Sequence, residues 1–517
     1  MTTSKISLLL ALLAIYIGYI TNQVHQMDQK YKQWNTNEWH IDQFSRPAFP
    51  IRFINAHHGN KHNNNMAMYL MQKFAVNPAL DKVLSLMQQA DTKDSVPKIL
   101  CDTNAQTDLT KRVEEFYTDI QQSTSLTYMG KVFLYATSVM SLTNHYGLLT
   151  LGMKEEVQRE TIIEPVFIAS LPRTGSTILH RTMALDTSRF RSFDLADMVV
   201  PLPQPVPRWD KIGRAQKAVE ANGLINTMKW IYPGLMECLE TMHGFRPDEA
   251  DEDLGWYDSG LGHFYMDPLM KLYPVYRKKK ETIESKEVAR YRYAWLSMIM
   301  KIYQSTDDVE WNERKQREGR AFFRQYAHST SNLPWLMKDP NHSAYLPELL
   351  EQFPDAKLIF THRNPGEVVP SLAKLFVIFT SPDFIPGEVG TSAKEWGEET
   401  LKRMDHYSSG LVDFTRDQNN NINQSGSTYS FPSSGSTSRI DLSFEDVRWD
   451  VPGVIEKIYQ QFYPDQPNPS NMANRAFKMY LEQNEREKHG NQRRSLEDFH
   501  LTEDDVAFRE YNDMFLT

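Results

Sequence analysis

The sequence predicts a three-layer α/β fold with a mostly parallel central sheet, preceded by a helical N-terminal region. Two apolar runs, at 165–170 and 357–361, predict buried strands, and each is followed by a polar turn and then by apolar residues at helical spacing. A third run predicts a strand at 335–338. Strands that alternate with helices are typical of parallel sheets, and such sheets bind their ligands beyond the carboxyl ends of the strands.

The chain of 517 residues is longer than a typical single domain of about 100–200 residues, so we expect several regions. They are a signal-anchor or transmembrane segment at 1–21, a polar stem at 22–65, a helical region at 66–156 and a catalytic domain at 157–517. Asn, Ser, Gly and Thr dominate at about 416–438, which predicts a flexible surface insertion in the catalytic domain.

The N-terminal segment is apolar from Ile6 to Ile20, after Lys5. A transmembrane helix usually needs about 20 apolar residues, and this segment is shorter. A cleaved signal peptide, a short signal-anchor and a buried helix therefore all remain open. We favour an uncleaved anchor, since no clear small-x-small cleavage site follows. This predicts a single-pass protein of the Golgi or another secretory-pathway membrane, with a lumenal catalytic domain and a glycan at Asn423.

Composition excludes several classes of function. The net charge of −9 argues against a nucleic-acid-binding protein, whose affinity comes from neutralising phosphates. With only Cys101 and Cys238, a disulfide framework is excluded, although one bridge between them remains open. The 15 histidines show no metal-ligand spacing, so we predict no metal.

The turn after the first predicted strand has the composition of an anion-binding loop. Gly175 lets the backbone approach a ligand, and the N-terminus of the following helix offers unpaired N–H groups. Further donors suited to an anion are contributed by Arg173, Thr174, Ser176 and Thr177. The alternative is a turn whose glycine and hydroxyl residues merely cap a helix.

This loop occupies the frame of the nucleotide-binding motif G-x-x-x-x-G-K-[ST] but departs from it twice. Ser170 replaces the first glycine, and Ser176 replaces the lysine. No acidic residue closes the second apolar run, where a metal-holding Asp is expected. The loop therefore fits a metal-free site for a sulfate–phosphate anhydride better than a kinase or GTPase site.

A second cation follows the second predicted strand. Arg363 comes directly after the run 357–361, and Ser371 lies about two helical turns further on. Helix capping alone does not explain this arrangement. Two anion sites at strand ends suit a nucleotide that carries phosphate at two separate places.

These motifs resemble those of sulfotransferases that depend on PAPS (3′-phosphoadenosine 5′-phosphosulfate). Residues 166–181 resemble the 5′-phosphosulfate loop of that family, and residues 336–342 and 353–365 resemble the segment leading into its 3′-phosphate site. Asp446 to Phe462 resembles the family's late strand and helix, and residues 495–515 resemble its closing segment. The resemblance extends from about residue 130 to the C-terminus.

The resemblance implies a P-loop-like sandwich and a set of ligand contacts. The residues implied to hold the 5′-phosphosulfate are Arg173, Thr174, Gly175, Ser176 and Thr177. Arg363 and Ser371 are implied to hold the 3′-phosphate. Two residues depart from the family pattern, because Arg173 stands where many relatives have Lys, and Asn364 stands where Asp is usual.

The resemblance also implies a base for the acceptor. The family subset places a Pro-x-Glu segment of the acceptor pocket between the two motifs, and residues 243–249 occupy that place. We therefore predict Glu249 as the base, with His243 as second choice and His263 as third. A carboxylate in this role needs a raised pKa, which partial burial supplies. The alternative is that the acidic run 248–253 is a solvated helix face.

Two further pairs of residues are candidates for ligand contact. Lys338 and His342 follow the third predicted strand and can face the same edge of the sheet, although residues in such places are often surface or core residues. Arg493 and Arg494 lie in a polar stretch near the C-terminus, from which they can close over the 3′-phosphate.

The resemblance implies a sulfotransferase that moves a sulfuryl group from PAPS to a hydroxyl, or as a second choice to an amine, by in-line displacement. Its acceptor is expected to be a small molecule, a lipid or a glycan. Two alternatives remain open. One is an ATP-dependent phosphotransferase with a P-loop-like site, and the other is a catalytically inactive nucleotide-binding protein.

Overall fold

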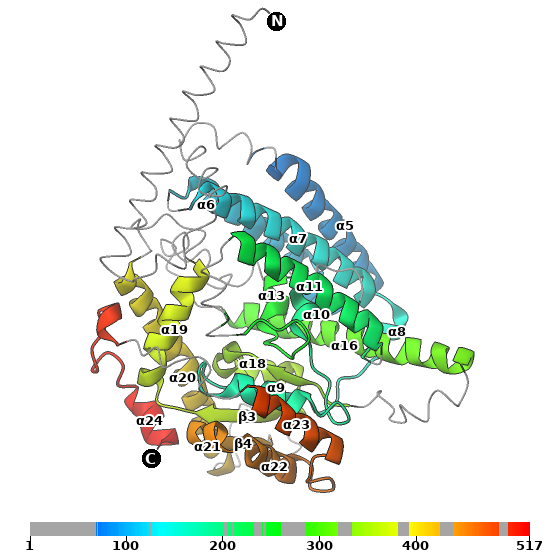
Figure 1. Ribbon diagram of the computed structural model, residues 1–517. Helices are drawn as coiled ribbons and strands as arrows, with labels where there is room; N and C mark the ends of the chain where they lie inside the picture. Colours follow the sequence, from blue (N-terminus) through cyan, green and yellow to red (C-terminus); the bar gives the residue numbers. More distant parts are fainter. Residues whose placement is uncertain are drawn as a thin grey trace, which may run out of the picture.

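The fold was analysed in a computed structural model (Figure 1). It describes residues 69, 71–124, 126–199, 205–208, 210–231, 240, 244–259, 285–318, 333–380, 392–423, 438–484 and 495–516. The segments predicted as an anchor and a stem, at 1–21 and 22–65, lie outside the described residues. Most of the predicted flexible insertion, from 424 to 437, does so as well.

The centre of the fold is a parallel sheet of four short strands. They are β1 (Val166–Ile168), β2 (Leu336–Lys338), β3 (Lys357–His362) and β4 (Arg439–Ser443). Their order across the sheet is β2-β1-β3-β4. Val166 lies opposite both Leu336 and Lys357, and Leu358 lies opposite Arg439. The three strands predicted from apolar runs are confirmed.

The two faces of the sheet belong to two different cores, which makes the fold three-layered. Phe167 and Phe360 point into one core, together with α16 (Lys286–Glu318), α18 (Leu346–Gln352), α19 (Pro365–Thr380) and α20 (Ala393–Asn423). Val166 and Ile359 point into the other, together with α9 (Ser176–Ala184), α22 (Val451–Phe462) and α23 (Asn471–Gln483). Because successive side chains of a strand point to opposite faces, a run that is apolar throughout is buried on both sides. The predicted three-layer α/β class is confirmed.

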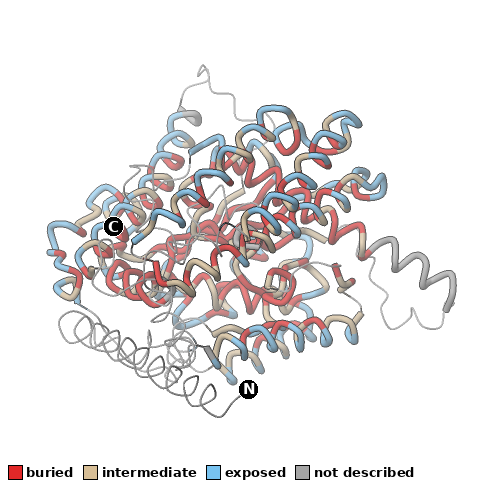
Figure 2. The backbone as a smooth tube through the Cα atoms, turned by 90° about the horizontal axis from the view of Figure 1, so that it is seen from above, coloured by how far each residue is buried: buried red, intermediate tan, exposed pale blue. Residues whose placement is uncertain are grey.

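A layer of helices precedes the sheet, as predicted for the N-terminal region. It consists of α5 (Asn77–Lys93), α6 (Thr103–Gln122) and α7 (Tyr128–Gly152), which lie side by side in Figure 1, and α7 also packs against α16. Asp102 caps α6 by accepting a hydrogen bond from Ala105 N at 2.8 Å, and Thr127 caps α7 in the same way. Figure 2 shows the buried residues gathered inside these layers, with the exposed residues on the outer sides of the helices.

The remaining described elements are short, except for α11, which has 21 residues. They are η2 (Gln72–Val76), η3 (Lys98–Leu100), α8 (Glu155–Gln158), α10 (Leu195–Val199), α11 (Lys211–Ile231), α13 (Leu254–Ser259), η5 (Pro340–Ala344), α21 (Phe444–Trp449), η7 (Glu497–Phe499) and α24 (Arg509–Phe515). Cys101 is buried and free, and Cys238 lies outside the described residues.

The late strand lies earlier than predicted. The range from Asp446 to Phe462 was expected to hold a strand and a helix, but it holds most of α21 and all of α22. The strand is β4, whose residues alternate between half-buried or exposed and buried positions, as an edge strand with one wet side does. Ser443 ends β4 and caps α21 by accepting a hydrogen bond from Asp446 N at 3.0 Å.

The order of the strands makes the carboxyl ends of β1 and β3 a topological switch point of the sheet. The chain leaves β1 through α9 toward β2 on one side, and it leaves β3 through α19 and α20 toward β4 on the other side. The helices that directly follow these two strands, α9 and α19, lie on opposite faces of the sheet. In open α/β sheets, ligands bind at this kind of topological switch point.

The structure contradicts the prediction of a membrane protein. Within the described part of the chain, no helix combines the length and the apolar character that are needed to cross a bilayer. The most apolar long helix, α7, instead places its apolar residues in the core against α5 and α16. We therefore withdraw the transmembrane anchor, the Golgi location with its lumenal domain, and the glycan at Asn423 that depended on it.

Candidate functional site

The loop after β1 has an unusual backbone conformation. Arg173 has a φ of 62° and Gly175 a φ of 79°, both in the left-handed region. Gly175 is the N-cap of α9, which begins at Ser176. A Cβ atom on Gly175 would lie 2.9 Å from Cγ1 of Val447. Only glycine therefore combines this φ with the close packing of α21 against the loop. The free N–H groups at the start of α9 face the same loop.

The loop after β3 leads into a second helix N-terminus. His362 ends β3, Arg363 follows, and α19 begins at Pro365. Asn364 Oδ1 accepts a hydrogen bond from Gly366 N at 2.9 Å. The Asn that departs from the family pattern therefore acts as a cap at the start of α19.

Direct hydrogen bonds join the two loops. Thr174 Oγ1 lies 2.6 Å from Thr361 Oγ1 and donates to Leu171 O at 2.7 Å. Arg363 Nη1 donates to the carbonyl oxygen of Arg173 at 3.1 Å. The two arginines are thus at one edge of the sheet. Burial and the nearby charge of Arg363 lower the pKa of the Arg173 guanidinium, so these two cations act on each other. The hydroxyl of Thr174 is already used within the protein, which leaves its backbone N–H as the group able to meet a ligand.

Removal of the Thr361 hydroxyl tests the hydrogen bond between Thr174 and Thr361. We expect Thr361→Val to lower the free energy of unfolding by about 0.5–1.5 kcal/mol, because one buried hydrogen bond is lost while Thr174 keeps Leu171 O. Urea unfolding measures the effect. Thr227→Val is the control, since the Thr227 hydroxyl bonds only Gly223 O on an exposed helix turn. Equal unfolding midpoints for the two variants would contradict this role of Thr361.

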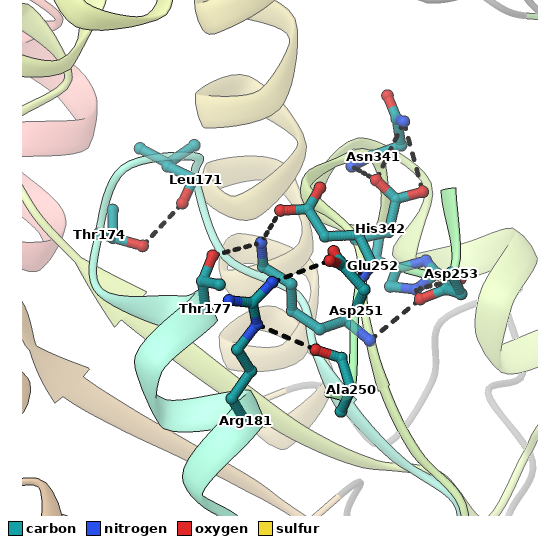
Figure 3. A network of polar contacts seen from close by, with 12 residues as sticks. Leu171, Thr174, Thr177, Arg181, Ala250, Asp251, Glu252, Asp253, Asn341 and His342 are labelled. Carbon is teal, nitrogen blue, oxygen red and sulfur yellow. Dashed lines mark hydrogen bonds and ion pairs between the residues drawn. The ribbon is translucent and has the colours of Figure 1, made fainter. Parts of the chain in front are cut away.

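A third segment, residues 244–253, lies against α9 and β2. Arg181, on α9, holds it through Nε to Ala250 O at 3.1 Å, Nη2 to Gly244 O at 2.9 Å and Nη2 to Asp251 Oδ2 at 2.9 Å. Figure 3 shows Arg181 reaching toward Ala250 and Asp251, with Thr177 and Glu252 near by. The acidic run is therefore not a solvated helix face. It is a turn in which Arg181 pairs with Glu249 and Asp251, Lys338 with Glu252 and His342 with Asp253, while Asp248 is exposed.

Glu249, the base predicted from the resemblance, lies at the far end of this cluster. Its carboxylate pairs with Arg181 at 3.1 Å and with Arg246 at 3.3 Å, and it accepts a hydrogen bond from Tyr480 at 3.2 Å. Burial raises the pKa of Glu249, although Arg181 and Arg246 oppose the shift. Its side chain is 20% exposed. Its role as base stays a prediction.

Glu252 lies nearer to the loop after β1, and the sequence did not single it out. Its carboxylate is in contact with Nζ of Lys338, and the same Nζ donates to Thr177 Oγ1 at 3.2 Å. The charge of Glu252 also acts on Arg173, whose pKa it raises against the effects of burial and Arg363. The Glu252 side chain is 21% exposed, so it is as accessible as Glu249. Lys338, which the sequence offered as a possible ligand contact, thus connects Glu252 to the first loop.

Asp253 and His342 form a buried support behind Lys338. Asp253 Oδ1 accepts a hydrogen bond from the backbone N–H of Lys338 at 3.0 Å, and Asp253 Oδ2 lies 3.2 Å from His342 Nε2. Burial by itself raises the pKa of the Asp253 carboxyl, but His342 and Arg292 outweigh burial and hold it below its usual value. His342 is fully buried and also contacts the Tyr293 hydroxyl at 3.2 Å. His342 therefore supports the site from the core rather than from the ligand side.

Of the remaining candidate residues, only Ser371 lies in the described part of the chain. Ser371 lies in the second turn of α19, about 9 Å along the helix from Pro365, and its side chain is half-buried. The candidates outside the described residues are His243, His263, Arg493 and Arg494. In the described ranges, no cluster of three or more His, Cys, Asp or Glu residues could hold a metal ion. That no metal takes part stays a prediction.

The arrangement brings two arginines and a carboxylate together at one edge of the sheet. Two arginines and two helix N-termini at the ends of β1 and β3 favour an anion. Glu252 and Lys338 lie at the side of the first loop, so a carboxylate and an ammonium group are next to the place where the anion is expected. Such a set can bind a phosphorylated donor, neutralise the charge on a leaving group and accept a proton.

Comparisons with known proteins agree on one family. Residues 165–463 match the sulfotransferase family. The structure is similar to the crystal structure of sulfotransferase STF9 from Mycobacterium avium, with a TM-score of 0.57, 17% identity, and coverage of 84% of this chain and 95% of that chain. It is also similar to sulfotransferase STF1 from Mycobacterium tuberculosis H37Rv, with a TM-score of 0.50, 18% identity, and coverage of 83% and 97%. A search of curated proteins gives no significant match. At these identities the two crystal structures support the fold, and the match over residues 165–463 supports the family: the chain belongs to the sulfotransferase family.

Proposed function

We propose that the protein transfers a sulfuryl group from PAPS to a hydroxyl group of a small-molecule acceptor. The observation that carries this proposal is the contact of Arg363 with the backbone of Arg173, in the loops that follow the neighbouring strands β3 and β1. PAPS carries a phosphosulfate at one end of its ribose and a phosphate at the other, so it needs two separate anion sites. The membership of the family supports sulfuryl transfer in general.

In this proposal each loop holds one end of the donor. Arg173 and the N-terminus of α9, with Gly175, Ser176 and Thr177, bind the 5′-phosphosulfate. Arg363, with Ser371 further along α19, binds the 3′-phosphate. Arg363 is well placed to change partners, because its guanidinium is 27% exposed and pairs with the mostly exposed Glu367 at 3.2 Å. Surface pairs of this kind contribute little, so a phosphate can displace the carboxylate.

The transfer step needs a base beside the sulfuryl group. The acceptor oxygen forms a bond to sulfur, the bond from sulfur to the bridging oxygen breaks, and 3′,5′-bisphosphoadenosine leaves with that oxygen. The acceptor proton goes to a carboxylate, and we place it on Glu252, which contacts Lys338 and acts on Arg173. Glu249 remains the second candidate, followed by His243. Lys338 is then placed to neutralise negative charge near Thr177.

Turnover without added metal tests the function. We expect purified protein to bind 3′,5′-bisphosphoadenosine in calorimetry and to transfer label from isotopically labelled PAPS to an acceptor in a cell extract, with EDTA present. The labelled product then identifies the acceptor. Transfer from ATP that needs Mg²⁺ would favour a phosphotransferase instead. Nucleotide binding without transfer to any acceptor would indicate a catalytically inactive protein.

A further inference from the structure

The segment 495–516 packs against the loop that carries Arg363. Its backbone approaches the start of α19 so closely that a Cβ atom on Gly366 would lie 2.8 Å from the carbonyl oxygen of Val506. Its last helix, α24, places Phe515 in a stack on His362, with ring centroids 4.3 Å apart and planes at 11°. The residue before Arg363 is thus covered by a helix that lies about 150 residues later in the chain.

A chain of hydrogen bonds runs through this contact. The Tyr511 hydroxyl lies 2.8 Å from His362 Nδ1, and His362 Nε2 lies 2.8 Å from Asp441 Oδ1. The other oxygen of Asp441 pairs with Arg439 Nε at 2.9 Å. Arg363 directly follows His362 in the chain, so these contacts hold the residue next to it. Tyr511 and His362 are both almost fully buried, so each of these polar groups depends on the others.

The direction of the hydrogen bond between His362 and Asp441 follows from the ionisation of Asp441. Burial opposes its ionisation, but His362 and Arg439 outweigh burial and hold the pKa of this carboxyl below its usual value. An ionised carboxylate only accepts, so His362 donates from Nε2. The other nitrogen, Nδ1, is left to pair with the Tyr511 hydroxyl.

We propose that Tyr511 is a positioning residue for the 3′-phosphate site, because its hydroxyl and Asp441 together hold His362, the residue that directly precedes Arg363. This inference rests on the proposed function and adds α24 to the nucleotide site. The side chain of Arg363 is guided from the other direction by Arg173 O at 3.1 Å and by the ring of Phe444, 4.4 Å below the guanidinium. With both the preceding residue and its own side chain held, Arg363 is preorganised for a phosphate.

The test compares two nucleotides that differ only in the 3′-phosphate. Calorimetry measures the Kd of 3′,5′-bisphosphoadenosine and of adenosine 5′-monophosphate for the unmodified protein and for Tyr511→Phe, which keeps the ring against Phe515. We expect Tyr511→Phe to weaken binding of the bisphosphate about threefold to tenfold, as loss of one hydrogen bond does. Binding of the monophosphate should stay unchanged, because a general loss of structure would weaken both nucleotides alike.

Tyr459→Phe is the matched control, since it removes another buried hydroxyl, one that donates to Asp186 at 3.1 Å away from both loops. It should leave both affinities as they are. Equal affinities of Tyr511→Phe and the unmodified protein for the bisphosphate would overturn the positioning role alone, as would an equal loss for both nucleotides. An unmodified protein that binds the two nucleotides equally would instead refute the two-site function from which this inference starts.

Discussion

Glu252→Gln is expected to lower kcat about 10²- to 10⁴-fold with little change in the KM for PAPS, the range typical of a lost general base. The amide has the size of the carboxylate and can still accept a hydrogen bond from Lys338, so the loop contact from Lys338 to Thr177 is retained. What is lost is the ability to take the acceptor proton. Steady-state kinetics with PAPS and the identified acceptor measures both constants.

Glu249→Gln is the comparison that decides between the two carboxylates. Glu249 is equally exposed but is held by Arg181, Arg246 and Tyr480. We expect this variant to keep most of its kcat, and to lose stability because a largely buried Arg181 loses one of its two acidic partners. A large fall in kcat for Glu249→Gln, with Glu252→Gln nearly unaffected, would return the base to the residue predicted from the family pattern.

Gly175→Ala is expected to lower the free energy of unfolding by about 2–5 kcal/mol and to weaken the binding of 3′,5′-bisphosphoadenosine. A left-handed φ costs an L-residue about 1–2 kcal/mol. The added methyl group would lie 2.9 Å from Cγ1 of Val447, and an overpacked contact of this kind costs about 1–3 kcal/mol more. Relief of either strain requires the loop to move away from α21, which displaces the N–H groups at the start of α9. Urea unfolding and calorimetry measure the two effects.

Gly223→Ala provides the matched control, because Gly223 lies in the exposed part of α11 and an added Cβ meets nothing within 4 Å. Alanine is the better helix former by about 1 kcal/mol, so this variant should gain stability and bind nucleotide normally. The double variant Gly175→Ala with Val447→Ala should recover only the part of the lost stability that comes from the contact with Val447. If Gly175→Ala were as stable as Gly223→Ala, the left-handed conformation of the loop would have to be wrong.

The sheet was predictable where its strands are buried on both faces. β1, β2 and β3 are short, continuous apolar runs between turn signals, and the structure places them within a residue or two of the predicted ranges. β4 is an edge strand with alternating burial that follows a polar stretch, so its pattern was weak. The helix caps that follow β4 do have a sequence signal. Ser443 stands three residues before Asp446, and Asp450 caps α22, which has a proline in its first turn.

The site was predictable at the two loops but not in the acidic run. The loops depend on local sequence, since a glycine, hydroxyls and an arginine follow each other directly after a strand. The run 248–253 contains five carboxylates, and its sequence does not tell which of them turn inward. That choice is made by partners far away in the chain, where Arg181 takes Glu249 and Asp251, and Lys338 takes Glu252. Lys338 was the available signal for an inward-facing carboxylate, because a lysine at the end of a buried strand needs a counter-ion.

The core on the Phe167 face of the sheet continues without interruption into α5, α6 and α7. The helices of residues 77–152 and the strand that carries the first loop therefore share one hydrophobic core, even though the family match begins only at residue 165. The position of β1, and of the loop with Arg173 that follows it, therefore depends in part on packing against residues upstream of the match. Specialisation of the protein can accordingly arise from substitutions in helices that carry no catalytic group at all.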